Sequence, residues 1–258
     1  ADWLDAVAAV TFDETLDPAF RALCLRLPGE DDLAQTIHAM GRIPDPAKIH
    51  AARREMSGAL AIRLGEGLHR LYKDLDDNAP FSPSADQAGR RALKIAALGL
   101  LTRRDGGKLA ASAFARARSM TEEIGALAAL LDVHQGDKEL VAFAARWGRD
   151  ANVMDKWYAL QIATAEPAEA AALTARLLET PGFDWRNPNR FRTAIGALAA
   201  NHAGFHHRSG AGYKLVADWL LKLDPLNPQT ASRVSTAFET WPRYDAARRK
   251  LARAELER

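Results

Sequence analysis

Two short stretches of the sequence, NPNRFR at Asn187–Arg192 and NPQTASR at Asn227–Arg233, use the same device to start a helix. An asparagine side chain can accept hydrogen bonds from the first free backbone N–H groups of a helix. A proline fits the first helical position because its fixed φ suits the helix and its missing N–H costs nothing there. Each stretch therefore predicts a well-defined helix start.

Arginines stand close to both of these helix starts, at Arg190, Arg192 and Arg233. The start of a helix is the positive end of its dipole, where acidic side chains are favoured and arginine is not. Gln229 and Arg233 are four residues apart, so they share one face of their helix. Such a polar patch could face an anion such as a peptide carboxylate, and the simpler alternative is a solvated helix end with ordinary surface arginines.

Helical patterns continue along almost the whole chain, and strand signals are scarce. The longest begins at Asp45-Pro46 and continues to Leu75, with apolar residues spaced by threes and fours. Near the C-terminus, helices are predicted over Pro228–Thr240 and Tyr244–Glu257. Short connections make successive helices antiparallel neighbours, so we expect an all-α fold of irregular helix pairs stacked in a superhelical array of the ARM/HEAT type.

The composition indicates a soluble globular protein without a nucleic-acid or membrane partner. The 258 residues include 35 basic and 33 acidic side chains, a balance that gives no reason to expect binding to nucleic acid or to an anionic membrane. No apolar run approaches the length of a membrane span. Cys24 is the only cysteine, which favours a reducing, cytoplasmic compartment. The first residue is Ala1 rather than methionine, which fits a piece of a longer polypeptide and equally fits a processed N-terminus.

No catalytic or metal-binding motif is complete in this sequence. A zinc peptidase helix places two histidines four apart with a glutamate beside the first, and none of the seven histidines has that context. His202 and His206 have the spacing, and His207 could add a third ligand, but Ala203-Gly204 between them indicates a loop. A water-exposed loop is the favoured interpretation, so we expect no catalytic residue and no metal site in this chain.

Several blocks of sequence resemble the C-terminal helical domain of the bacterial aminopeptidase N family, which belongs to the gluzincin zinc aminopeptidases. The resemblance is densest in NVMDKWYALQ at Asn152–Gln161. Further blocks follow the family's order over nearly the whole chain: Leu16–Phe20, Met120-Thr121 with Ala126–Leu130, Asn187–Arg192, Asn227–Arg233 and Arg243–Ala246.

The resemblance implies that residues 1–258 are a single α-helical C-terminal domain of a larger aminopeptidase. In that family a zinc-bearing catalytic domain and a β-sandwich domain precede the helical one, so those domains and peptide substrates are the expected partners. The zinc would be bound in the catalytic domain, whose motifs do not occur here. Arg192, Gln229 and Arg233 match family positions that face the enclosed cavity, which implies a place in the substrate channel.

The resemblance thus implies a domain that encloses the active site of a zinc aminopeptidase without catalytic residues of its own. The sequence departs from the familiar pattern at Arg208–Tyr213 and at Asp74–Pro83, which leaves the shape of the channel undefined. The alternative is a free-standing α-solenoid scaffold that binds a protein or peptide in its concave face.

Overall fold

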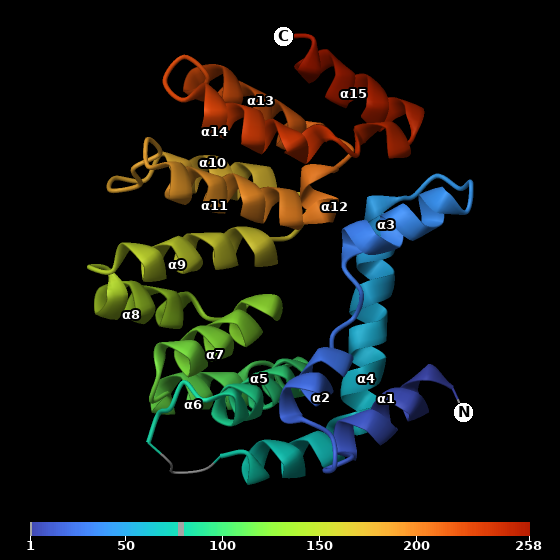
Figure 1. The fold of residues 1–258 in the computed structure, drawn as a ribbon, viewed down its shortest axis with the longest axis vertical. Coiled ribbons are helices and arrows are strands. Elements are labelled where there is room, and N and C mark those ends of the chain that lie inside the picture. The colour runs from blue at the N-terminus through green and yellow to red at the C-terminus, as the bar shows by residue number, and fades with distance from the viewer. Residues whose placement is uncertain (1, 77–79) are drawn as a thin grey trace. The chain divides into compact units, whose positions relative to one another are not determined.

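The computed structural model describes residues 2–76 and 80–258, and every element within them is helical (Figure 1). The chain divides into two compact units. Unit 1 contains Ala1–Leu27 and Arg53–Arg146, and unit 2 contains Pro28–Ala52 and Trp147–Arg258. Each unit is therefore built from two segments that are distant in sequence.

Unit 1 is a group of helices in which α5, α6 and α7 contact one another and α2 packs along α5. Its elements are α1 (Trp3–Phe12), α2 (Pro18–Cys24), the larger part of α4 (Pro46–Asp74), α5 (Ala85–Asp105), α6 (Lys108–Arg116), α7 (Met120–Asp132) and nearly all of α8 (Asp137–Trp147).

The long helix α4 confirms the predicted pattern of threes and fours. Its 29 residues begin at Pro46, one residue after Asp45, whose carboxylate accepts a hydrogen bond from the Ala47 N–H at 3.1 Å. Leu60, Leu64 and Leu68 lie on one buried face of the helix. The other large, fully buried side chains of unit 1 come from α5, α7 and α8: Leu93, Leu101, Leu127, Leu130 and Phe143.

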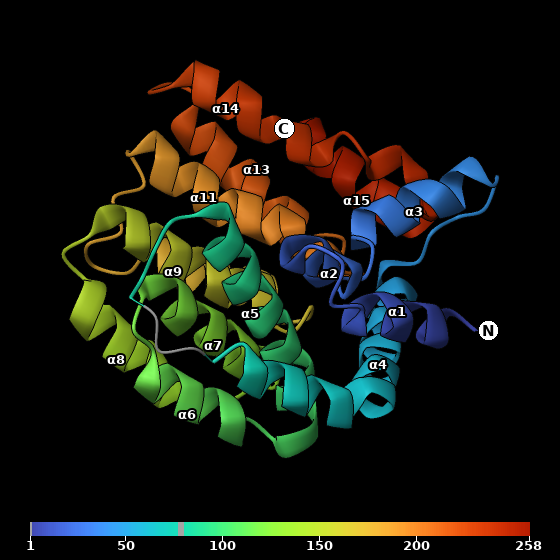
Figure 2. The same cartoon turned by 60° about the horizontal axis from the view of Figure 1, so that its bottom comes forward.

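Unit 2 is a layered stack of short helices (Figures 1 and 2). In this stack α9 packs on α11, α11 contacts α14, and α14 contacts α13. Its elements are α3 (Glu30–Ala39), the start of α4, α9 (Ala151–Thr164), α10 (Ala170–Leu178), α11 (Pro188–Ala200), α12 (His202–Phe205), α13 (Ala211–Leu223), α14 (Pro228–Ser235), the 3-10 turns η1 (Thr236–Phe238) and η2 (Trp241–Arg243), and α15 (Ala246–Leu256).

Large apolar and aromatic side chains fill the core of unit 2. Phe191, Phe205 and Tyr213 are at most 1% exposed, and edge-to-face contacts join Phe205 to Tyr213 and Phe238. Such aromatic pairs add specific geometry to the apolar area that they bury. The core therefore fixes how the layers of this unit meet.

The all-α prediction is confirmed, and the main error in the helix boundaries lies near the C-terminus. The helix predicted over Pro228–Thr240 ends at Ser235, and α15 begins at Ala246 rather than at Tyr244. The hydroxyl groups of Ser235 and Thr236 donate to backbone carbonyls three residues earlier, which favours tighter turns over a continuing helix. Residues 77–79 of the stretch Asp74–Pro83, where the sequence departs from the family pattern, lie outside the described part of the chain.

Within residues 2–76 and 80–258, no helix combines the length and the apolar character that crossing a bilayer requires.

Alanine substitutions at two helical glycines of unit 2 should change the free energy of unfolding in opposite directions. A Cβ at Gly212 of α13 would lie 2.5 Å from the backbone oxygen of Phe205, whereas a Cβ at Gly196 of α11 would meet no atom within 4 Å. Gly212→Ala should lower the free energy of unfolding by roughly 1–3 kcal/mol because the two backbones must separate. Gly196→Ala should raise it by roughly 0.5–1 kcal/mol through helix propensity.

Urea unfolding of the two variants checks both signs. Equal effects of the two substitutions would contradict the close approach of α13 to the α12 segment.

Candidate functional site

Both Asn-Pro helix starts have the predicted caps. The Asn187 side-chain oxygen accepts hydrogen bonds from the N–H groups of Asn189 at 3.0 Å and Arg190 at 3.3 Å. The Asn227 side-chain oxygen accepts one from the N–H of Thr230 at 3.0 Å. A proline occupies the first helical position in each case, so the prediction from the sequence is confirmed.

The apolar faces of α11 and α14 are buried in the core of unit 2. Phe191 and Ala194 of α11 are fully buried, and Ala231 and Val234 of α14 are at least nine-tenths buried. The two helices contact each other directly. The polar residues considered in the sequence analysis, Arg192 on α11 and Gln229 and Arg233 on α14, lie outside these buried faces.

Gln229 and Arg233 lie together on the exposed face of α14. Both side chains are exposed, and neither makes a hydrogen bond or ion pair within the described part of the chain. Their separation by four residues places them one above the other on the helix. This pair therefore offers an amide and a guanidinium to an acceptor outside the protein.

Arg192 is half-buried and turns back on the start of its own helix. Its Nε donates to the backbone oxygen of Pro188 at 3.2 Å, and its Nη2 donates to the side-chain oxygen of Asn189. Part of its donor capacity is therefore used within α11. The structure places Arg192 in the same unit as Gln229 and Arg233, but with fewer free donors.

Arg190 has a structural role that the sequence did not reveal. Its side chain is 13% exposed, and its Nε lies 2.7 Å from a carboxylate oxygen of Asp155 on α9. It also donates to the backbone oxygens of Gly182 and Ala151, both at 3.2 Å. Asp155 thus supplies the negative charge that is favoured near a helix start. The ion pair between Arg190 and Asp155 stabilises the contact between α11 and α9.

The prediction of a water-exposed loop at His202–His206 is wrong. Residues His202–Phe205 form α12, and both histidines are 3% exposed. The His202 Nε2 lies 2.7 Å from the Tyr244 hydroxyl, and the His206 Nδ1 lies 2.8 Å from the Tyr213 hydroxyl. Burial lowers the pKa of His206 to about 2 and also lowers that of His202, so both rings are neutral.

This histidine–tyrosine cluster of His202, His206, Tyr213 and Tyr244 is extended by charged groups from other parts of unit 2. Arg248 of α15 donates from Nε to the backbone oxygen of His206 at 2.7 Å. Glu30 of α3 accepts a hydrogen bond from the Ala203 N–H at 3.3 Å, and its other carboxylate oxygen lies 2.8 Å from the His50 Nδ1.

The histidines that could have formed a metal site are instead engaged in structural contacts. The Nδ1 of His207, which could have added a third ligand, lies 2.9 Å from the Ser209 hydroxyl. No cluster of three or more histidine, cysteine, aspartate or glutamate side chains arranged for a metal ion occurs in residues 2–76 and 80–258. The spacing of the histidines alone could not separate a ligand set from a core cluster, because it does not show that each ring pairs with a tyrosine, and Tyr244 is 42 residues from His202.

The fold and this surface define a class of protein: an all-helical repeat protein of the ARM type, with a capped, arginine-bearing polar face. The chain belongs to the family described as "Domain of unknown function (DUF3458_C) ARM repeats", which matches residues 1–258.

Sequence relatives connect this family member to aminopeptidases. Aminopeptidase N from Caulobacter vibrioides is 38% identical over 99% of this chain and 30% of its own length. Aminopeptidase N from Escherichia coli is 33% identical over 98% of this chain and 29% of its own length. The chain thus spans less than a third of these relatives and matches their C-terminal part, as the resemblance implied.

A solved structure shares the fold. The crystal structure of Legionella pneumophila aminopeptidase A in complex with aspartic acid matches with a TM-score of 0.86 at 25% identity. The match covers 98% of this chain and 31% of that protein. The ARM/HEAT-like fold predicted from the sequence is therefore confirmed.

The buried histidines make stability depend on pH. Because the pKa of His206 is about 2 when folded and near 6.5 when unfolded, the unfolded chain takes up the proton first as the pH falls. The stabilisation is complete above pH 6.5 and should decrease by about 1.4 kcal/mol per pH unit below it for this residue alone. Urea unfolding at pH 7.5, 6 and 5 measures the decrease.

His206→Gln removes the titrating group and should flatten that dependence, even though the variant is less stable at every pH. His69→Gln changes an exposed histidine on α4 and serves as the control with the wild-type slope. An unchanged slope in His206→Gln would contradict a neutral, buried His206.

Proposed function

We propose that residues 1–258 form the C-terminal helical domain of a zinc metalloaminopeptidase that removes N-terminal amino acids from peptides. The domain would enclose the active site and line the substrate channel without contributing catalytic residues. The observation that carries this proposal is the match of nearly the entire chain to the C-terminal part of two proteins named aminopeptidase N.

The zinc of such an enzyme belongs to another part of the parent protein. The chemistry of the residues present does not fit a zinc site, because the neutral histidines of unit 2 are hydrogen-bonded to tyrosines and no set of three ligands converges among the described residues. We expect the catalytic domain of the same chain to bind the zinc ion. No step of the hydrolysis is therefore assigned to this domain.

The polar face of α14 supports a role in holding the peptide. A guanidinium donates in a fork that matches a carboxylate or a peptide carbonyl, and an amide can donate and accept at once. Gln229 and Arg233 present these groups without internal partners, whereas Arg192 is partly engaged with Pro188 and Asn189. Residues of the peptide beyond the first would be bound here.

The remaining partners follow from the same proposal. The catalytic and β-sandwich domains of the parent chain would contact this domain, and peptides would be its only ligands in the channel. The relatives are about three times longer than the part matched here, which supports further domains. We also propose a reducing, cytoplasmic compartment, because Cys24 is the sole cysteine of the 258 residues and cannot form a disulfide within them.

Alanine substitution in the full-length enzyme tests the channel role. Arg233→Ala should lower kcat/KM for tripeptides about five- to tenfold, the loss of one charge-assisted hydrogen bond, and leave kcat/KM for single-residue amides unchanged. Gln229→Ala and Arg192→Ala should act in the same direction with smaller effects. Only the longer substrate reaches these side chains, so the ratio of the two kcat/KM values is the informative quantity.

Arg249→Ala is the matched control, because it removes an exposed arginine from α15. It should leave both kcat/KM values at the wild-type level. Equal losses on tripeptides and single-residue amides in Arg233→Ala would refute the channel role, and full activity on both would do the same.

A further inference from the structure

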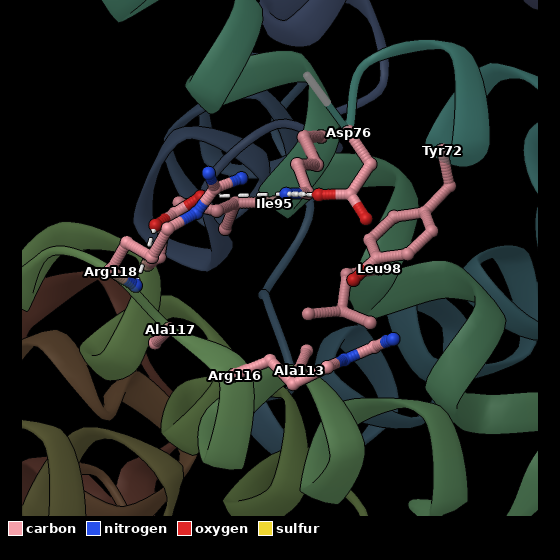
Figure 3. Close-up of a pocket in the computed structure, with 10 residues that line it drawn as sticks. Tyr72, Asp76, Ile95, Leu98, Ala113, Arg116, Ala117 and Arg118 are labelled. Atoms are coloured by element: carbon pink, nitrogen blue, oxygen red, sulfur yellow. Dashed lines mark hydrogen bonds and ion pairs between the residues drawn. The ribbon is translucent and has the colours of Figure 1, made fainter. Parts of the chain in front are cut away.

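A cavity of about 310 Å³ opens in unit 1 between the end of α4, α5, α6 and the start of α7 (Figure 3). Its volume lies at the lower end of the range of small-molecule sites, roughly 300–1,000 Å³. The side chains that line it are Tyr72, Asp76, Lys94, Ile95, Leu98, Ala113, Arg116, Ala117, Arg118 and Glu122. Neither the family description nor the names of the relatives assigns a ligand to it.

An apolar surface forms part of this pocket. Ile95 and Leu98 of α5 contribute branched side chains, and Ala113 of α6 and the following Ala117 contribute small ones. The two alanines leave the space that larger residues would fill. This surface can therefore accommodate the apolar body of a small ligand.

A group of oppositely charged side chains forms another wall. The Nζ of Lys94 lies 2.7 Å from Asp76 and 3.4 Å from Glu122. Burial opposes the charge on Lys94, but the hydrogen bond to Asp76 and the carboxylate charges outweigh burial and raise the pKa of Lys94. The hydrogen bond from Lys94 also lowers the pKa of Asp76. Both carboxylates are thus already paired.

Two donors around the pocket are unused. Arg116 is exposed and makes no hydrogen bond or ion pair with any described residue. The hydroxyl of Tyr72 likewise has no hydrogen-bond partner among residues 2–76 and 80–258, and burial raises the pKa of Tyr72, so the group remains a donor. Figure 3 shows both side chains at the pocket with Leu98 beside them. Arg118 adds a further positive charge to the lining.

We propose that this pocket binds a small monocarboxylate with a branched apolar body. The carboxylate would accept hydrogen bonds from the Arg116 guanidinium and the Tyr72 hydroxyl, and the body would rest on Ile95, Leu98 and the two alanines. The Arg116 guanidinium supplies the positive charge that one carboxylate on the ligand would balance. A cationic ligand would find no unpaired carboxylate in the lining, because Asp76 and Glu122 both contact Lys94.

This proposal is independent of the proposed peptidase function. All ten lining residues lie in unit 1, whereas Arg192, Gln229 and Arg233 lie in unit 2. Loss of one function by substitution should therefore leave the other intact.

Isothermal titration calorimetry of the full-length protein with 4-methylpentanoate tests whether the pocket binds a monocarboxylate. The uncharged ligand of the same shape, 4-methylpentanamide, is titrated for comparison. We expect the carboxylate to bind about tenfold more tightly than the amide, since a charge-assisted hydrogen bond contributes about that factor. Arg116→Gln should weaken the binding of the carboxylate about tenfold and abolish that preference. Ala113→Leu should abolish binding of both ligands by filling the cavity.

The matched control is Arg149→Gln, which removes an exposed arginine outside the pocket and should retain wild-type affinity. A soak of 4-methylpentanoate into crystals of the full-length protein should place it against Arg116. Equal affinity for the carboxylate and the amide, or equal carboxylate affinity in wild type and Arg116→Gln, would overturn the proposal. Density for the ligand only at another site would overturn it too. Because Arg116 is exposed, its substitution tests the proposal even if Ala113→Leu fails to fold.

Discussion

The hydrogen bond between His202 and Tyr244, 2.7 Å long and buried in unit 2, joins α12 to the turn before α15. A buried imidazole or phenol without a partner would cost free energy, so each of these groups requires the other. The same requirement applies to the neighbouring pair of His206 and Tyr213. Once these two pairs form, α12, α13 and the residues before α15 have little freedom left.

Charged groups extend this constraint to a distant part of the sequence. Glu30 on α3 contacts the N–H of Ala203 and the ring of His50, so the segment Pro28–Ala52 is held to the helices that follow Trp147. Arg248, 7% exposed, binds the backbone oxygen of His206 and the carboxylate of Asp245. Buried ionic groups of this kind are costly when a partner is removed, which makes them specific for one arrangement.

The arginines near the helix starts have different roles, although they are the same residue type. Arg190 is buried against Asp155 and stabilises the contact of α11 with α9, whereas Arg233 projects from α14 without an internal partner. Arg192 is intermediate, because it binds its own helix start. The free donors are the ones available to a ligand. The polar face of α14 and the Arg116 pocket of unit 1 share this property and lie in separate units.

The sequence by itself determined the helical class, the long helix α4 and the two Asn-Pro starts, because these depend on local capping and on the spacing of apolar residues. It also indicated the relation to aminopeptidases, through blocks of sequence that occur in the same order as in that family. Only the tertiary structure decided which histidines and arginines are buried and which groups they contact. The residues next to His202 do not show whether its side chain is exposed or buried, and Tyr244, its partner, is 42 residues away. Asp155 and Arg190 are 35 residues apart, and Tyr72 and Arg116 line one pocket from different helices. Local sequence patterns therefore do not predict that these side chains lie close together.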